Sequence, residues 1–154
     1  MRDDPVMDPL GIRRAQTTDR DQLWPVVQDF AASFVPERSA FDRSLDGLIA
    51  REDTLILVAE QRGFEIVGYL LASHHGTLFA NGPVAWVEEL MVVAPARRSG
   101  IGRALMAEAE RWATGVPVAY ISLATRRAEG FYDSLGYERS AAFLRKILGP
   151  GRAR

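Results

Sequence analysis

The stretch from Trp86 to Ala113 constrains the fold most, because three recognisable pieces follow one another in it. Its first part, WVEELMVV, is apolar and β-branched, which favours a strand. A turn rich in Arg and Gly follows. A helix is then predicted from Gly100 to Thr114, with its apolar residues on one side. The order strand, turn, helix brings the unpaired N–H groups of the first helical turn to the end of the strand.

This turn has the properties of an anion-binding site. The first helical amides and the helix dipole attract negative charge, and Gly100 and Gly102 let a ligand approach the backbone closely. Arg97, Arg98 and Arg103 add charged donors. A pyrophosphate fits such a site. Two familiar alternatives fail, since the Lys-Ser/Thr pair of a P-loop is missing and no third glycine completes a dinucleotide fingerprint.

Bulk composition fits one soluble domain over residues 1–154, with flexible ends expected at residues 1–11 and 149–154. The net charge of −1 gives no case for a nucleic-acid partner. The absence of cysteine excludes thiolate zinc sites and a cysteine nucleophile. No apolar run is long enough for a membrane span and no signal peptide precedes the domain, so we expect a cytoplasmic protein. We also expect no bound metal.

Hydrophobic periodicity predicts the element order β-α-α-β-β-β-α-β-α-β, which is a mixed α/β arrangement. Thr17 or Thr18 is the expected cap of the first helix. The predicted strands are 12–16, 54–60, 65–73, 85–93, 116–124 and one within 137–148, and the predicted helices are 19–33, 36–53, 100–114 and 127–135.

Two motifs resemble a known family. The pattern Arg97-x-x-Gly100-x-Gly102 resembles the R/Q-x-x-G-x-G/A acetyl-CoA signature of the GCN5-related N-acetyltransferase (GNAT) superfamily. AEGFYDSLGYE, from Ala128 to Glu138, resembles that family's A-x-x-F/L-Y-x-x-x-G-F segment. The resemblance implies a mostly antiparallel central sheet flanked by helices. It also implies transfer of an acetyl group from acetyl-CoA, as co-substrate, to a primary amine of a small molecule or peptide by direct attack.

The resemblance also assigns residues to the cofactor. The pantetheine arm would pair with the 90–92 backbone in a slot where strands 85–93 and 116–124 splay apart, and the pyrophosphate would sit on amides 98–103. Arg98 and Ser99 replace the family's commoner Gly-Lys pair, and Thr125 stands where many members carry an Asn. The cofactor-binding candidates are Leu90, Met91, Val92, Arg97, Arg98, Ser99, Gly100, Ile101, Gly102, Arg103 and Thr125. Homodimers are common in proteins of this kind.

An amine must lose a proton before it can attack a thioester, so the reaction needs a general base. Glu88 is our first candidate and Glu89 the second. Adjacent strand residues face opposite sides, so we expect only one of them in the cleft. The motif match makes Tyr132 the expected general acid. His74 and His75 could line the acceptor site or simply lie in a loop, and we favour the loop. Backbone amides near Met91 are expected to polarise the thioester carbonyl.

Two other classes of protein stay open at this point. One is a non-catalytic acyl-CoA-binding or regulatory module with the same fold, since fold alone does not decide function. The other is an unrelated nucleotide-binding protein that uses the same anion site. The acceptor amine cannot be read from the residues, because its pocket would be built by the N-terminal part of the chain.

Overall fold

The computed structural model describes residues 10–30, 33–61, 63 and 65–150. The expected flexible leader and tail therefore lie largely outside the described residues. The elements follow the chain in this order: β1 (Gly11–Arg14), a 3-10 turn η1 (Thr17–Asp19), α1 (Arg20–Phe30), α2 (Arg38–Ile49), β2 (Thr54–Gln61), β3 (Glu65–His75), β4 (Val84–Val92), a 3-10 turn η2 (Ala94–Ala96), α3 (Ile101–Gly115), β5 (Ile121–Leu123) and α4 (Glu129–Asp133).

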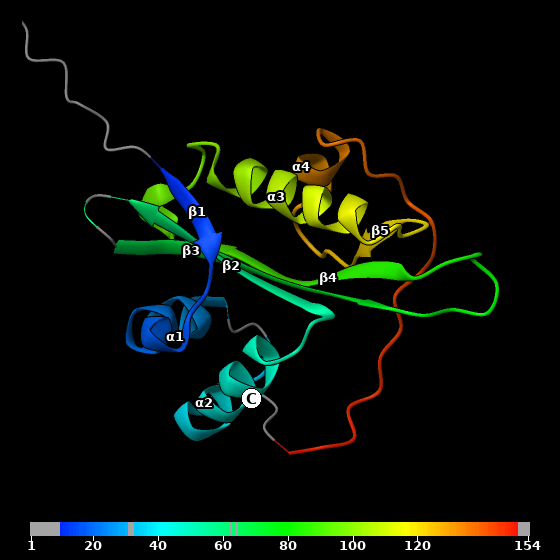
Figure 1. Cartoon of the computed structure of the whole chain (residues 1–154). Helices are drawn as coiled ribbons and strands as arrows, with labels where there is room; N and C mark the ends of the chain where they lie inside the picture. The colour runs from blue at the N-terminus through cyan, green and yellow to red at the C-terminus, as the bar shows by residue number, and fades with distance from the viewer. Residues whose placement is uncertain (1–9, 31–32, 62, 64, 151–154) are drawn as a thin grey trace, which may run out of the picture.

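One five-stranded sheet organises the molecule, in the order β1-β2-β3-β4-β5. The first three pairings are antiparallel and β4–β5 is parallel. Helices α3 and α4 cover one face of the sheet, and α1 and α2 cover the other (Figure 1). This confirms the predicted mixed sheet flanked by helices.

Both faces of the sheet are apolar, because successive side chains along a strand point alternately into two hydrophobic cores. Leu70 and Val87 pack toward Leu105 of α3 on one side. Tyr69 and Met91 pack with the α1 and α2 side chains on the other. A sheet buried on both faces needs strands that carry apolar residues on both sides, and β2, with the sequence TLILVAEQ, has that composition.

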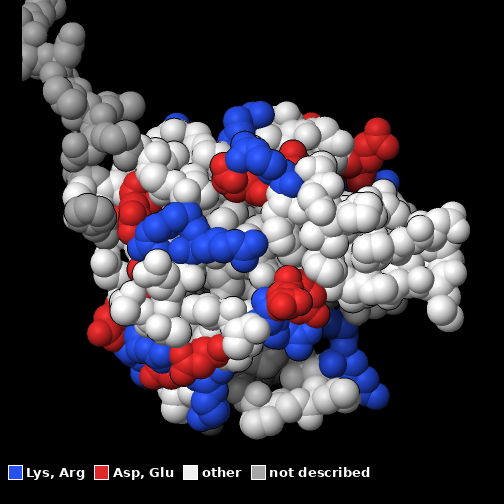
Figure 2. All heavy atoms as spheres, in the orientation of Figure 1, with Lys and Arg blue, Asp and Glu red and all other residues white. Residues whose placement is uncertain are grey.

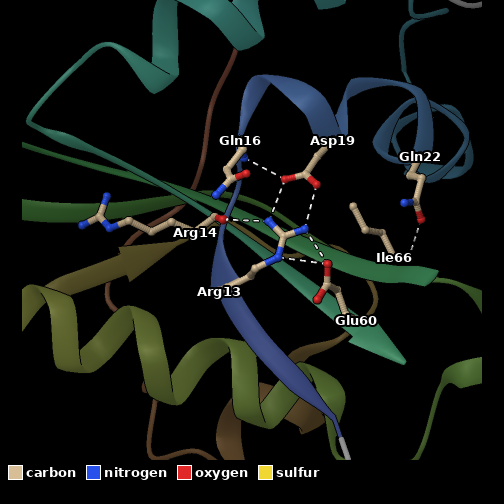
Figure 3. Close-up of polar contacts among 7 residues, drawn as sticks. All are labelled: Arg13, Arg14, Gln16, Asp19, Gln22, Glu60 and Ile66. Atoms are coloured by element: carbon tan, nitrogen blue, oxygen red, sulfur yellow. Dashed lines mark hydrogen bonds and ion pairs between the residues drawn. The ribbon is translucent and has the colours of Figure 1, made fainter. Parts of the chain in front are cut away.

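A charged cluster ties the start of the chain to the sheet (Figure 3). Arg13 of β1 donates to both carboxylate oxygens of Asp19 at 2.8 and 2.7 Å, and it also contacts Glu60 of β2. The Gln16 amide donates to Asp19 at 2.7 Å, so this carboxylate closes the first turn. Hydrogen bonds from Arg13 lower the pKa of Asp19. The expected cap at Thr17 or Thr18 was wrong, because the helical turn begins one residue earlier, after Gln16.

The C-terminal part of the prediction needs two corrections. The strand expected over 116–124 shortens to Ile121–Leu123. The last strand expected within 137–148 is absent, because residues 138–148 have no regular secondary structure and form no backbone hydrogen bond to another described residue. Their path runs from α4 to the opposite side of the sheet, near α2 (Figure 1). Across the described ranges, no helix is both long and apolar enough to cross a bilayer.

Candidate active site

A bulge in β4 determines where its two glutamates point. Leu71 of β3 pairs with Glu89 and the next residue, Ala72, pairs with Val87, so Glu88 is the extra residue without a partner. Such an insertion interrupts the strict alternation of side chains along a strand. Val87 packs toward α3 and Met91 toward α1 and α2, and the bulge lets Glu88 and Glu89 share the second face. The expectation that only one glutamate faces the cleft was wrong.

Both glutamates line a pocket of about 430 Å³ on the side of the sheet that carries α2. Its walls come from the end of α2, the start of β2, the end of β3 and the bulge of β4. The lining residues are Leu48, Arg51, Asp53, Thr54, Leu71, Ser73, His74, His75, Glu88 and Glu89. This volume falls in the range typical of small-molecule sites.

Acidic groups dominate the pocket's charge. Asp53, Glu88 and Glu89 contribute three carboxyl groups, and the one arginine, Arg51, is paired with Asp53 through bonds of 2.8 and 2.6 Å. The two histidines belong to the end of β3 and line the pocket, so their assignment to a loop was wrong.

Glu89 has the environment of a tuned carboxyl group. The hydroxyl of Tyr69 donates to its Oε2 at 3.2 Å from the neighbouring strand. Burial raises the pKa of Glu89, the nearby Glu88 charge raises it further, and the Tyr69 hydrogen bond opposes both. Tyr69 is itself 2% exposed, and the ring of Phe30 packs edge-on against it at 6.4 Å. Glu88, by contrast, is exposed at the pocket surface.

The turn before α3 presents free amides, as its composition predicts. Arg98 and Gly100 adopt left-handed backbone angles, with φ of 60° and 84°. The first helical backbone bond is donated by Ala104, to Gly100. The N–H groups of residues 98–103 have no backbone acceptor among the described residues. Consecutive free amides of this kind form an anion-binding concavity.

The arginine side chains of this turn have separate partners. Arg97 donates from Nε to the Val92 carbonyl at 2.8 Å, and so fastens the turn to the end of β4. Arg103 reaches Ser134 after α4 at 3.2 Å. A second contact joins the same helices, since a Cβ built on Gly102 would lie 3.2 Å from Cζ of Phe131. Gly102 therefore allows α4 to pack closely against the first turn of α3.

The sheet opens beside the glutamates. Strands β4 and β5 pair only from Ala85–Ile121 to Val87–Leu123. Beyond that point, Leu90, Met91 and Val92 pair with β3 on one side. In the part of the chain that the structure describes, no strand pairs with them on the other side. An added extended group can bind such an open edge.

Tyr132 lies on the α3 side of the sheet, and neither it nor Thr125 lines the acidic pocket. Tyr132 of α4 packs against the core cluster there, and burial raises its pKa. The Thr125 hydroxyl accepts a bond from the Ala128 amide at 3.1 Å, which closes the turn into α4. The structure thus brings Glu88 and Glu89 together on one face of β4 and leaves Tyr132 on the other.

A family model described as "Acetyltransferase (GNAT) domain" matches residues 52–139, which include most of the pocket lining, the anion-binding turn and α4. The chain belongs to the GNAT acetyltransferase family. This GNAT protein is 31% identical over 113 residues to aminoglycoside N(6')-acetyltransferase type 1 of Klebsiella aerogenes, covering 68% of the chain and 70% of that relative. With the family and this relative established, it is an acetyl-CoA-dependent N-acetyltransferase.

Solved structures agree on the fold. Glucosamine-6-phosphate N-acetyltransferase from Arabidopsis thaliana superposes with a TM-score of 0.82 at 15% identity, covering 92% of this chain and all of that one. Aminoglycoside N-acetyltransferase AAC(6')-Iy, solved in complex with CoA, superposes with a TM-score of 0.79 at 19% identity, covering 94% and 99%.

Sequence reasoning missed Tyr69 and Asp53 as site residues of this GNAT protein. Asp53 was predicted as the last residue of the helix 36–53, whereas α2 ends at Ile49 and Asp53 lies in the turn before β2. Tyr69 is one apolar residue in a strand of apolar residues, and only the register between β3 and β4 brings its hydroxyl to Glu89. The two adjacent glutamates in an apolar strand indicated that β4 belongs to the site. Nothing in the sequence indicated the same for β3.

Proposed function

We propose that this GNAT protein acetylates a primary amine of a small molecule or peptide by direct attack on acetyl-CoA. The single observation that carries the proposal is the position of Glu89. It lies in a small-molecule-sized pocket, next to the open edge of β4. Acetyl-CoA supplies an acyl thioester that is activated toward amines. The free amides of residues 98–103 are suited to its diphosphate, and the open edge at residues 90–92 to its extended arm.

Glu89 is the proposed general base, in place of our first candidate Glu88. A base works best when its pKa lies near the operating pH, and burial moves the pKa of Glu89 in that direction. Its hydrogen bond to Tyr69 fixes the carboxylate, which leaves the other oxygen for the ammonium proton. The amine nitrogen then bonds to the acetyl carbon as the carbon–sulfur bond breaks.

The remaining roles fall to groups around β4. Backbone amides near Met91 are suited to polarise the thioester carbonyl. Tyr132 is the proposed donor of a proton to the departing thiolate, since burial keeps its phenol protonated. Glu88, exposed at the pocket surface, is suited to hold a second cationic group of the acceptor.

The acidic lining supports a polycationic acceptor such as an amino sugar or a polyamine. Glu88 and Glu89 remain without a cationic partner among the described residues, whereas Asp53 is paired with Arg51. The named activity of the Klebsiella aerogenes relative, on aminoglycosides, agrees with this acceptor class. We place aminoglycosides and polyamines first in the substrate panel.

The test follows thiol release from acetyl-CoA against a panel of an aminoglycoside, a polyamine, an amino acid and a peptide. The chain has no cysteine, so it adds no background to thiol detection. We expect release that depends on the amine, and calorimetric binding of CoA but not of ATP or NAD. CoA binding without turnover on any amine would favour the non-catalytic module. Binding of ATP or NAD without CoA would favour the nucleotide-binding alternative.

A further inference from the structure

Arg51 and Asp53 form an ion pair in the wall of the acidic pocket. Nε of Arg51 donates to Oδ1 of Asp53 at 2.8 Å, and Nη2 donates to Oδ2 at 2.6 Å. Both side chains line the pocket beside Glu88 and Glu89. The guanidinium engages both oxygens of the carboxylate, so a cationic ligand meets Asp53 with its charge already compensated.

The carboxylate is held by the sheet, whereas the guanidinium is held only by the carboxylate. The Asp53 carbonyl accepts a bond from the His74 amide of β3 at 2.9 Å. The hydroxyl of the buried Thr54 donates to Oδ1 of Asp53 at 3.2 Å. Arg51 bonds to no other side chain among the described residues, and its side chain is 59% exposed. Exposed ion pairs of this kind are weak, so Arg51 can leave while Asp53 stays in place.

Asp53 keeps its charge with or without the arginine. The bonds from Arg51 lower the pKa of Asp53, and an aspartate without such a partner is also ionised at neutral pH. The next part of the chain after the pocket-lining histidines adds nothing to this balance. Residues 76–87 of the β3–β4 hairpin contain no charged side chain and form an uncharged lobe (Figure 2). Arg51 therefore decides whether the charge of Asp53 is open to a ligand.

Asp53 and Glu89 lie on opposite sides of β3. Asp53 immediately precedes β2, Glu89 belongs to β4, and β3 pairs with both strands. Neighbouring strands are about 4.8 Å apart, so β2 and β4 are separated by about 10 Å. An ammonium group bound at Glu89 thus leaves Asp53 to a second cationic group of the same molecule.

We propose that Arg51 is a specificity-determining residue, which occupies Asp53 until a second cationic group of the acceptor displaces it. The inference rests on the proposed function, since it concerns the acceptor of the same pocket. Arg51 is tethered beside Asp53, so a free monoamine competes with it poorly. A second amine of an acceptor that is already bound at Glu89 has a high effective concentration at Asp53. The arginine therefore reserves Asp53 for acceptors with several amines.

Calorimetric titration of spermidine, a triamine, into the full chain tests the displacement. Arg51→Gln should bind spermidine about two- to fivefold more tightly than the wild type, since one exposed ion pair no longer competes. Asp53→Asn should bind it more weakly. Adding Arg51→Gln to Asp53→Asn should then change the affinity by less than about twofold, because the contested carboxylate is gone. An unchanged affinity in Arg51→Gln would overturn the proposal. Equal gains in both backgrounds would also overturn it, because Arg51 would then act by long-range repulsion alone.

Arg111→Gln is the matched control, because it removes the same charge from a similar ion pair outside the pocket. The side chains of Arg111 and Glu108 are 67% and 38% exposed, against 59% and 37% for Arg51 and Asp53. Spermidine affinity should stay at the wild-type value in this control. A gain equal to that of Arg51→Gln would mean that net charge controls binding, and it would overturn the proposal.

Turnover separates this inference from the proposed function. Arg51→Gln should lower the KM for spermidine by more than it lowers the KM for butylamine, a monoamine that cannot reach both carboxylates. An equal fall for the two amines would overturn the proposal. Tighter spermidine binding in Arg51→Gln without acetyl transfer in any variant would support the displacement and overturn the proposed function. Acetyl transfer to spermidine without a gain from Arg51→Gln would overturn the displacement alone.

Discussion

The Tyr69 hydroxyl donates a 3.2 Å hydrogen bond to Oε2 of Glu89 across the β3–β4 pairing. Three influences on this carboxyl group can therefore be separated by mutation. Burial and the Glu88 charge raise its pKa, and the Tyr69 bond lowers it.

Replacing Glu89 by Gln should lower kcat by about 10²–10⁴-fold, the usual contribution of a general base. The amide has nearly the shape of the carboxylate but cannot accept the ammonium proton. CoA affinity measured by calorimetry should stay within about two-fold, because no proposed cofactor contact involves this side chain. Glu108→Gln on α3 is the control, because this glutamate lies outside the pocket that contains Glu89. If Glu89→Gln keeps wild-type turnover, another group is the base.

The pH profile of kcat should shift in opposite directions in two variants. The base is active when deprotonated, so the rate rises as pH passes the raised pKa of Glu89. Tyr69→Phe removes the bond that lowers this pKa and should move the acidic limb to higher pH. Glu88→Gln removes a neighbouring negative charge and should move the limb to lower pH. Limbs that coincide in all three proteins would show that Glu89 does not control the rate.

Gly102→Val should weaken CoA binding and lower the free energy of unfolding by about 1–3 kcal/mol, the usual cost of overpacking. A Cβ here already meets the Phe131 ring at 3.2 Å, so a larger side chain must push α4 away from the first turn of α3. Phe131→Leu in the same chain should restore part of both losses. Equal losses with and without Phe131→Leu would mean that the ring is not the obstacle. Calorimetry and thermal unfolding supply the two measurements.

Asp19→Asn should lower the free energy of unfolding at pH 7 by about 1–3 kcal/mol, because the half-exposed Arg13 loses its charge-assisted bonds to Asp19 and keeps only Glu60. The pKa of Asp19 is lowered in the folded state. Its stabilisation is thus complete above the unfolded pKa and is lost as pH falls through the folded pKa. Urea denaturation should show the wild type and the variant converging in acid. A constant difference at all pH values would contradict this assignment.

The fold could be predicted from the sequence where a local pattern and the tertiary structure agree. The helix of α3, the antiparallel strands β2 to β4 and the turn at Gly100 all follow from periodicity and glycine placement. The segment after Tyr137 was not readable in this way. Its composition predicts a strand, but strand formation also needs pairing with a neighbouring edge, and this segment forms no backbone hydrogen bond to another described residue.

The candidate site was readable only in part, for a similar reason. Glu88 and Glu89 stand out as acids in an apolar strand. Their shared orientation depends on a bulge, however, and a bulge is a property of the pairing between two strands rather than of either one. Tyr69 was missed on the same ground. Pairing register is the information that one-dimensional reasoning lacks here.

The extra residue in β4 also has a use in protein design. Residues on either side of Glu88 keep a regular ladder with β3, from Trp86–Ser73 on one side to Leu90–Leu70 on the other. Deleting Glu88 would therefore join two stretches that are already in step, and neither hydrophobic layer would need to be rebuilt. The Glu88 carboxylate can therefore be removed by deleting one residue. Such a deletion offers a route to an enzyme with a different preference for charged acceptors.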